Sequence, residues 1–129
     1  MRATEPEQIH RLFEHAFNAG DIDGLLALYE PDATLVPQPG VVVVGTDGIR
    51  ESLRWLLDRN GRITIESKLV LRVDDIAYLS NRWSLTGGTM PDGSAADLGA
   101  TTAEVARRQA DGTWLYVIDN AWGDHATTD

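Results

Sequence analysis

Residues 18–34 read NAGDIDGLLALYEPDAT, and this stretch decides how the first half of the chain is organised. Gly20 suits the left-handed residue that commonly ends a helix. Asp21 or Asp23 can then cap a second, short helix, because a carboxylate accepts hydrogen bonds from the free amides at a helix start. Pro31 ends that helix. The stretch therefore predicts a junction between two helices, followed by extended chain.

Working outward, a third helix and two short strands are predicted. Upstream, a capping box that begins at Thr4 leads into apolar residues spaced for one helix face. Downstream, Thr46 is the expected cap of a third helix that ends near Asn60. Residues 34–36 and 41–44 predict short strands between the second and third helices.

After residue 61 the apolar pattern changes to the alternation that is typical of strands. Four strands are predicted, at residues 62–73, 76–86, 100–109 and 114–122, with residues 87–99 as a loop. Helices grouped ahead of an antiparallel sheet favour an α+β domain. We expect a cone-shaped, curved antiparallel sheet packed on three N-terminal helices, with a pocket on its concave face.

Length, charge and composition narrow the class of protein. One domain over residues 1–129 is expected, with a core at about 4–123 and a flexible C-terminal tail at 124–129. The net charge of −9 repels phosphate backbones and anionic lipids, so we expect neither nucleic acid nor a membrane as partner. The absence of cysteine excludes thiolate chemistry. No apolar run approaches the ~20 residues of a membrane span, which favours a cytoplasmic location.

Three stretches resemble a known family. Residues 18–34 resemble the start of ketosteroid-isomerase-like and SnoaL-like proteins, and residues 45–51 resemble the family's lead into its third helix. Residues 111–123, DGTWLYVIDNAWG, look like the SgcJ/EcaC-type branch. The chain is thus similar to the nuclear-transport-factor-2-like (NTF2-like) superfamily. The resemblance implies the cone-shaped fold but no single activity, because this fold hosts isomerases, cyclases, hydrolases and transport factors.

The isomerases of this superfamily use a tyrosine and a protonated aspartate to stabilise an oxyanion, and a second aspartate to shuttle the proton. The resemblance puts the tyrosine position at Phe13 and the shuttle at Pro37. The protonated aspartate falls at Glu104 or Val105. Phenylalanine has no hydrogen-bond donor on its side chain and proline carries no titratable proton, so we do not expect a standard ketosteroid isomerase.

The expected pocket residues come from strand alternation together with the resemblance. Alternate residues from Trp114 to Trp122 share one face of the last strand, and the resemblance turns that face toward the pocket. Asn120 could instead bond a neighbouring backbone group. The expected ligand-binding residues are Phe13, Tyr29, Leu53, Asn81, Trp83, Ile118, Asn120 and Trp122.

Three residues are candidates for proton transfer: Glu104, Tyr29 and His10. A carboxyl group in an apolar cavity has a raised pKa and can exchange protons near neutral pH. A three-residue hairpin loop turns Glu104 toward the face of Trp114, whereas a two-residue turn puts Val105 there and leaves Glu104 solvated. The histidines are too scattered for a metal site, and neither a metal nor a cofactor is expected.

Three functions remain open. The first is an enzyme that isomerises, cyclises or hydrolyses a small, largely apolar, polyketide-like molecule by acid–base chemistry. The second is a non-catalytic module that binds a hydrophobic ligand between Trp83 and Trp122. The third is a dimerisation module whose cavity is filled by its own side chains. Leu115 and Val117 on the outer sheet face favour a homodimer.

Overall fold

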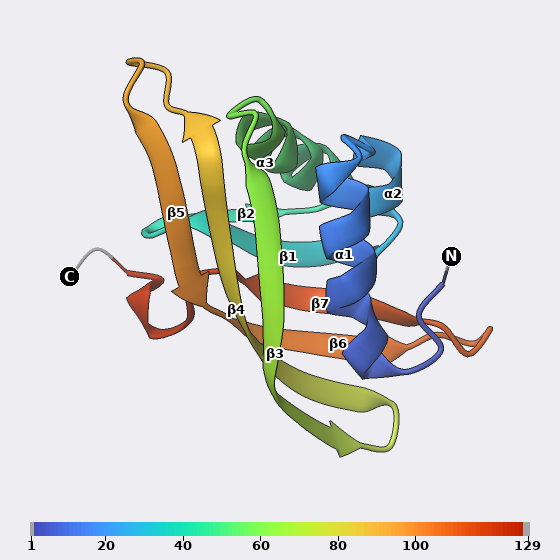
Figure 1. The fold of residues 1–129 in the computed structure, drawn as a ribbon. Helices are drawn as coiled ribbons and strands as arrows, with labels where there is room; N and C mark the ends of the chain where they lie inside the picture. The colour runs from blue at the N-terminus through green and yellow to red at the C-terminus, as the bar shows by residue number, and fades with distance from the viewer. Residues whose placement is uncertain (1, 128–129) are drawn as a thin grey trace.

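The computed structural model describes residues 2–127, and Figure 1 shows its three α-helices and curved sheet. The elements in chain order are η1 (Pro6–Gln8), α1 (Ile9–Asn18), α2 (Ile22–Leu26), β1 (Tyr29–Gln38), β2 (Val41–Val44), α3 (Thr46–Leu57), β3 (Arg62–Val73), β4 (Ile76–Thr89), β5 (Ala95–Thr101), β6 (Ala103–Arg108), β7 (Trp114–Asn120) and η2 (Gly123–His125).

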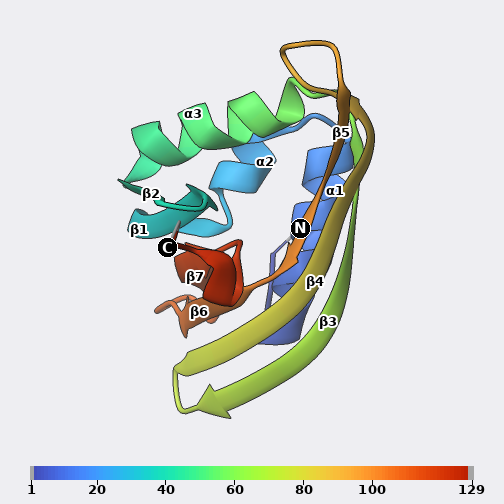
Figure 2. The same ribbon diagram turned by 90° about the vertical axis from the view of Figure 1, so that its left-hand side faces the viewer.

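The sheet has seven strands in the order β2-β1-β7-β6-β4-β3, with β5 alongside β4. In Figure 2 the long strands β3 and β4 curve around α1, so the helices lie on the concave side. The predicted α+β class and curved sheet are confirmed. The sheet is mixed rather than wholly antiparallel, because β1 pairs with β7 in parallel. No hairpin joins these two strands, so nothing in the local sequence sets their relative direction.

Several boundaries differ from the sequence-based expectation. Gly45 rather than Thr46 precedes the first residue of α3, and the strand expected at residues 100–109 is divided between the end of β5 and β6. The second helix ends at Leu26, and Tyr29 already belongs to β1, where it pairs with Tyr116 of β7. Pro31 lies where the β1–β7 register is irregular, a position that tolerates a missing backbone N–H. The expected loop at residues 87–99 is partly strand, since β4 continues to Thr89 and β5 begins at Ala95.

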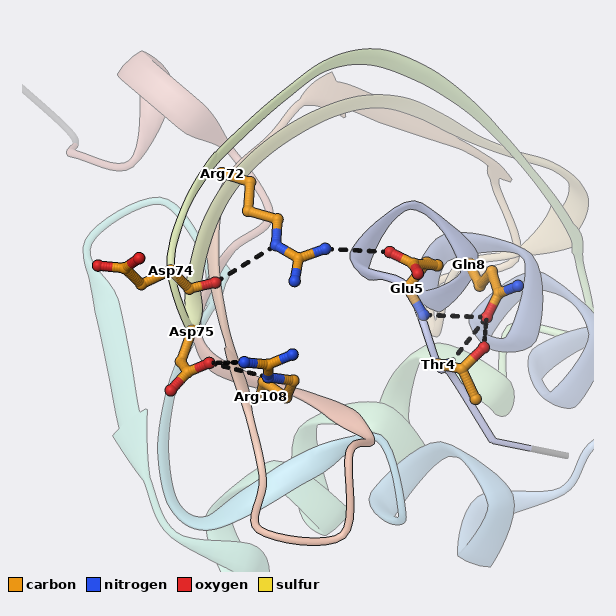
Figure 3. A network of polar contacts seen from close by, with 7 residues as sticks. All are labelled: Thr4, Glu5, Gln8, Arg72, Asp74, Asp75 and Arg108. Atoms are coloured by element: carbon orange, nitrogen blue, oxygen red, sulfur yellow. Dashed lines mark hydrogen bonds and ion pairs between the residues drawn. The ribbon is translucent and has the colours of Figure 1, made fainter.

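Polar contacts tie the N-terminal segment and β6 to the β3–β4 hairpin (Figure 3). Arg72 donates to Glu5 Oε2 at 3.1 Å, and Arg108 Nε donates to Asp75 Oδ1 at 2.8 Å. The Arg72 guanidinium also lies 4.9 Å from the ring centre of Trp114. These exposed ion pairs contribute little stability individually. Arg72 also covers the end of β7 at which Trp114 lies.

The division into a core and a flexible tail stays a prediction. The helix η2 (Gly123–His125) spans the expected boundary between core and tail, and the carbonyl of Ala126 accepts the Gly40 N–H at 2.7 Å, while residues 128–129 lie outside the described part. No helix in residues 2–127 is long and apolar enough to cross a membrane.

Candidate functional site

A cavity of about 560 Å³ opens among α3, β1–β2 and the concave face of the sheet. That volume suits a drug-sized molecule. Most of its wall is apolar: Phe13, Leu35, Val43, Leu53, Leu56, Ile63, Ile65, Trp83, Leu98 and Trp122. Its buried polar residues come from β4, β6, β7 and the β5–β6 junction.

Glu104 and Asp119 form the centre of this polar region. They lie opposite each other on β6 and β7, and each is only 5% exposed. Asn81 Nδ2 donates to Glu104 Oε1 at 2.6 Å, and Thr102 Oγ1 donates to the same oxygen at 2.7 Å. Tyr29 Oη donates to Asp119 Oδ2 at 2.5 Å. The result is a buried carboxyl pair in which one oxygen of each group accepts hydrogen bonds from uncharged donors.

The hairpin loop turns Glu104 inward. Gln109 N–H donates to the Thr113 carbonyl at 2.7 Å, so the loop has three residues and Arg108 pairs with Trp114. This is the register for which Glu104 was expected on the face of Trp114.

A β-bulge at Val117 then reverses the faces of β7. Ala106 pairs with Tyr116 and Val105 pairs with Ile118, so Val117 has no partner on β6. Because a bulge adds one residue to one strand, every later side chain changes face. Asp119 therefore lines the cavity, whereas Ile118 and Asn120, its neighbours on β7, do not.

Ile118 and Asn120 do not line the cavity, which corrects their expected place in the pocket. Ile118 is 41% exposed on the outer face. Asn120 Nδ2 donates to the Gly123 carbonyl at 2.9 Å, and its Oδ1 accepts the Trp122 N–H at 3.2 Å. The structure thus shows the alternative for Asn120, in which its side chain bonds neighbouring backbone groups.

Tyr29 and His10 also lie outside the cavity lining. Tyr29 is buried behind Asp119 and touches it through the hydroxyl group, so it supports the carboxyl pair. His10 is buried on α1, and burial, followed by the charge of Arg11, lowers its pKa. The structure brings Tyr29 to the carboxyl pair and leaves His10 apart from it.

Burial sets the protonation of the pair. It raises the pKa of Glu104 well above its ordinary value, and the charge of Asp119 raises it further against the hydrogen bonds from Thr102 and Asn81. Burial also raises the pKa of Asp119, but hydrogen bonds from Tyr29 and Glu104 oppose this rise. Glu104 is thus the member that keeps a proton, and Asp119 is the member that ionises first.

Two tryptophans form the aromatic part of the wall. Trp83 Nε1 donates to the Ala121 carbonyl at 2.6 Å, and Trp122 Nε1 donates to the Pro37 carbonyl at 2.9 Å. Their ring centres are 5.5 Å apart at an interplanar angle of 82°. With both N–H groups bonded to backbone, the rings present apolar surface to the cavity.

Of the expected ligand-binding residues, five line the cavity: Phe13, Leu53, Asn81, Trp83 and Trp122. Sequence reasoning missed Asp119 and Thr102. One signal for Asp119 was present, since aspartate is depleted in strand interiors and its presence there needs a reason. Within residues 2–127, no group of three His, Cys, Asp or Glu side chains is placed to hold a metal ion.

Comparison with known proteins shows the same architecture. The model of the SnoaL-like domain matches residues 9–117. A ketosteroid isomerase-like protein from Erwinia carotovora atroseptica superposes with a TM-score of 0.74 at 24% identity, covering 88% of each chain. A Novosphingobium aromaticivorans protein assigned as a scytalone dehydratase superposes with a TM-score of 0.75 at 14% identity, covering 88% of this chain and 77% of that one.

A Thiobacillus denitrificans protein assigned as a calcium/calmodulin-dependent protein kinase type II association domain is similar too. Its TM-score is 0.77 at 21% identity, and the match covers 95% of this chain and 98% of that one. At these identities the likeness concerns the fold. No curated protein matches the chain significantly.

Proposed function

This chain belongs to the SnoaL-like domain family, and on that premise we propose that it is a cofactor-independent acid–base enzyme acting on a small, largely apolar molecule. One observation carries the proposal: Glu104 and Asp119 are buried opposite each other in the wall of an open, mostly apolar cavity. Titratable groups with perturbed pKa values in a cleft are candidates for catalytic residues.

The pair divides the work of proton transfer. Glu104 holds the proton and serves as general acid, while Asp119 is the carboxylate that serves as general base. Tyr29 keeps Asp119 ionised by donating to its carboxylate. A polyketide-like molecule fits this pair chemically, because carbonyl groups accept a proton and the C–H bonds beside them lose one. Isomerisation, cyclisation and hydrolysis all need both transfers.

Trp83 and Trp122 favour a second candidate, a non-catalytic binder of hydrophobic ligands. Their apolar ring faces can hold a ligand with no chemistry at the carboxyl pair. The interpretation as a dimerisation module with a self-filled cavity does not fit, since about 560 Å³ stays open and Trp114 lies under Arg72 instead.

Mass spectrometry on freshly purified protein tests the proposal. Small molecules that co-purify with the wild type and not with Trp83→Ala are identified and then incubated with the protein in D2O. An acid–base enzyme converts the molecule or exchanges a carbon-bound proton for deuterium. Both Glu104→Gln and Asp119→Asn should slow that exchange by about 10²–10⁴-fold.

The change Glu66→Gln, at an exposed carboxylate on β3, is the matched control and should leave the exchange rate unchanged. Retention of a molecule with no conversion and no exchange supports the binder instead. Exchange that survives both carboxyl variants defeats the assignment of the acid and the base.

A further inference from the structure

The buried end of the cavity is rich in hydrogen-bond acceptors and has no free donor. The Asn81 and Thr102 side chains already donate to Glu104, and the Tyr29 hydroxyl already donates to Asp119. The indole N–H groups of Trp83 and Trp122 are likewise bonded to backbone carbonyls. Two further donors are engaged as well: the Tyr116 hydroxyl of the lining is hydrogen-bonded to Glu104, and the proton that Glu104 holds is directed at Asp119. Every one of these donors is therefore used within the protein.

Acceptors, in contrast, remain available. Asp119 and Glu104 both line the cavity. The Asn81 side chain is oriented by its own donation to Glu104, and its buried Oδ1 has no partner among the described residues. A buried acceptor without a donor is unfavourable, and a ligand donor can relieve it.

The charges of the lining residues also favour a ligand that donates hydrogen bonds. Three lining residues are acidic, namely Glu51, Glu104 and Asp119, and none of the described lining residues is lysine, arginine or histidine. The remaining side-chain donors of the lining, on Gln38, Ser52 and Trp55, stand at exposed or half-buried positions of β1 and α3. An anionic ligand group would meet the negative charge of Asp119 at the buried end and find no free donor there.

Resting on the proposed function, we infer that the ligand enters with a hydrogen-bond donor, a hydroxyl or an amine, directed at Asp119, and that the cavity excludes carboxylates and phosphates. Asp119 is the specificity-determining residue. An alcohol and an ammonium group share this chemistry, because both donate to a carboxylate.

Four naphthalene probes of one shape test this inference by isothermal titration calorimetry at pH 7. They are 1-naphthalenemethanol, 1-naphthylmethylamine, 1-(methoxymethyl)naphthalene and 1-naphthoate. The alcohol or the amine should bind about ten-fold or more tightly than the methyl ether, since a hydrogen bond to a charged group is worth that factor. The naphthoate should bind most weakly. If the amine binds more tightly than the alcohol, the natural ligand carries an ammonium group. If the alcohol binds as tightly or more tightly, the natural ligand is neutral.

Asp119→Asn should reduce the preference for the donor probes and strengthen naphthoate binding, because an amide repels no anion and also donates. Asp32→Asn, an exposed change on β1, is its matched control and should keep the wild-type order. The wild-type order tests the inference even if Asp119→Asn does not fold. Naphthoate binding as tightly as the alcohol and the amine overturns the inference and leaves the ligand-pocket proposal standing. Failure of all four probes to bind overturns both.

Discussion

Glu104 on β6 and Asp119 on β7 lie directly opposite each other on adjacent strands, and each is 5% exposed. The pairing depends on the unpaired Val117, because without that extra residue Ile118 would stand opposite Glu104. A single bulge thus converts one buried carboxyl group into a coupled pair. The chemical consequences of the pair can be measured without a known substrate.

The contribution of Glu104 to the stability of the protein should fall as the pH rises above about 4.5. Burial raises the pKa of Glu104 in the folded state, so between its ordinary pKa and the raised value the folded chain holds a proton that the unfolded chain has released. Unfolding then releases protons, and rising pH favours it. Glu104→Gln cannot titrate, so between pH 5 and pH 8 its melting temperature should fall less than that of the wild type, by on the order of 5 °C.

Circular dichroism melts across that pH range measure the difference. Glu66→Gln removes an exposed carboxylate and should keep the wild-type slope. Equal slopes for wild type and Glu104→Gln would show that Glu104 is not held protonated.

Tyr29→Phe should raise the pKa of Asp119. The Tyr29 hydroxyl donates to Asp119 Oδ2 at 2.5 Å and stabilises the ionised carboxylate, so removing it favours the protonated form. A ¹³C NMR titration of aspartate-labelled protein measures this directly. Tyr78→Phe, at an exposed position on β4, serves as control. An unchanged or lower Asp119 pKa in Tyr29→Phe contradicts the supporting role given to this hydroxyl.

Trp83→Ala should weaken binding of the naphthalene probes by about ten-fold or more. The change removes a large ring surface from the wall and the N–H bond to Ala121. Trp83→Phe keeps a smaller ring and should give an intermediate affinity, which preserves the test if the alanine variant unfolds.

Asn120→Leu should leave the affinity for the same probes unchanged. Asn120 bonds the backbone of Trp122 and Gly123 and does not line the cavity, so its loss should lower stability by about 1 kcal/mol only. Calorimetry with one probe measures the affinity, and a thermal melt measures the loss of stability. A change in probe affinity without loss of stability would return Asn120 to the pocket.

We expect a homodimer that pairs through the outer face of the sheet. Leu71, Tyr78, Val105 and Ile118 are successive partners across β3, β4, β6 and β7 and form an apolar row. Leu71, Tyr78 and Ile118 are large and exposed, and such patches usually mark an interface.

Light scattering at micromolar concentration should give about twice 14.1 kDa for the wild type. Ile118→Lys should shift the mass to that of the monomer. A 14.1 kDa wild type would refute the expectation.

We expect no turnover of a β,γ-unsaturated ketosteroid. Phe13 and Pro37 both line the cavity, and neither can donate or shuttle a proton at the positions where the isomerases use tyrosine and aspartate. The ultraviolet absorbance of the conjugated product provides the assay. Turnover that is abolished by Glu104→Gln would show that the carboxyl pair replaces the missing groups.

Much of the fold was determined by the sequence alone, because local patterns carry it. The apolar spacing of α1 and α3 and the alternation of β3 and β4 depend on residues close together in the chain. Alternation also placed Asn81 and Trp83 on one face of β4, and the family resemblance implied that this face lines the pocket, where both residues are found. The hairpin loop of β6–β7 narrowed Glu104 to two orientations and left the choice open.

Contacts between distant segments decided the rest. The bulge at Val117 arises where β7 meets β6 on one side and the parallel strand β1 on the other, and no residue pattern within β7 reveals it. Strand alternation assumes an unbroken register, so one unpaired residue moved Ile118 and Asn120 outward and Asp119 inward. The carboxyl pair at the centre of the site therefore exists only in the tertiary structure, because its two members reach the same wall through strand pairing and not through their spacing in the chain.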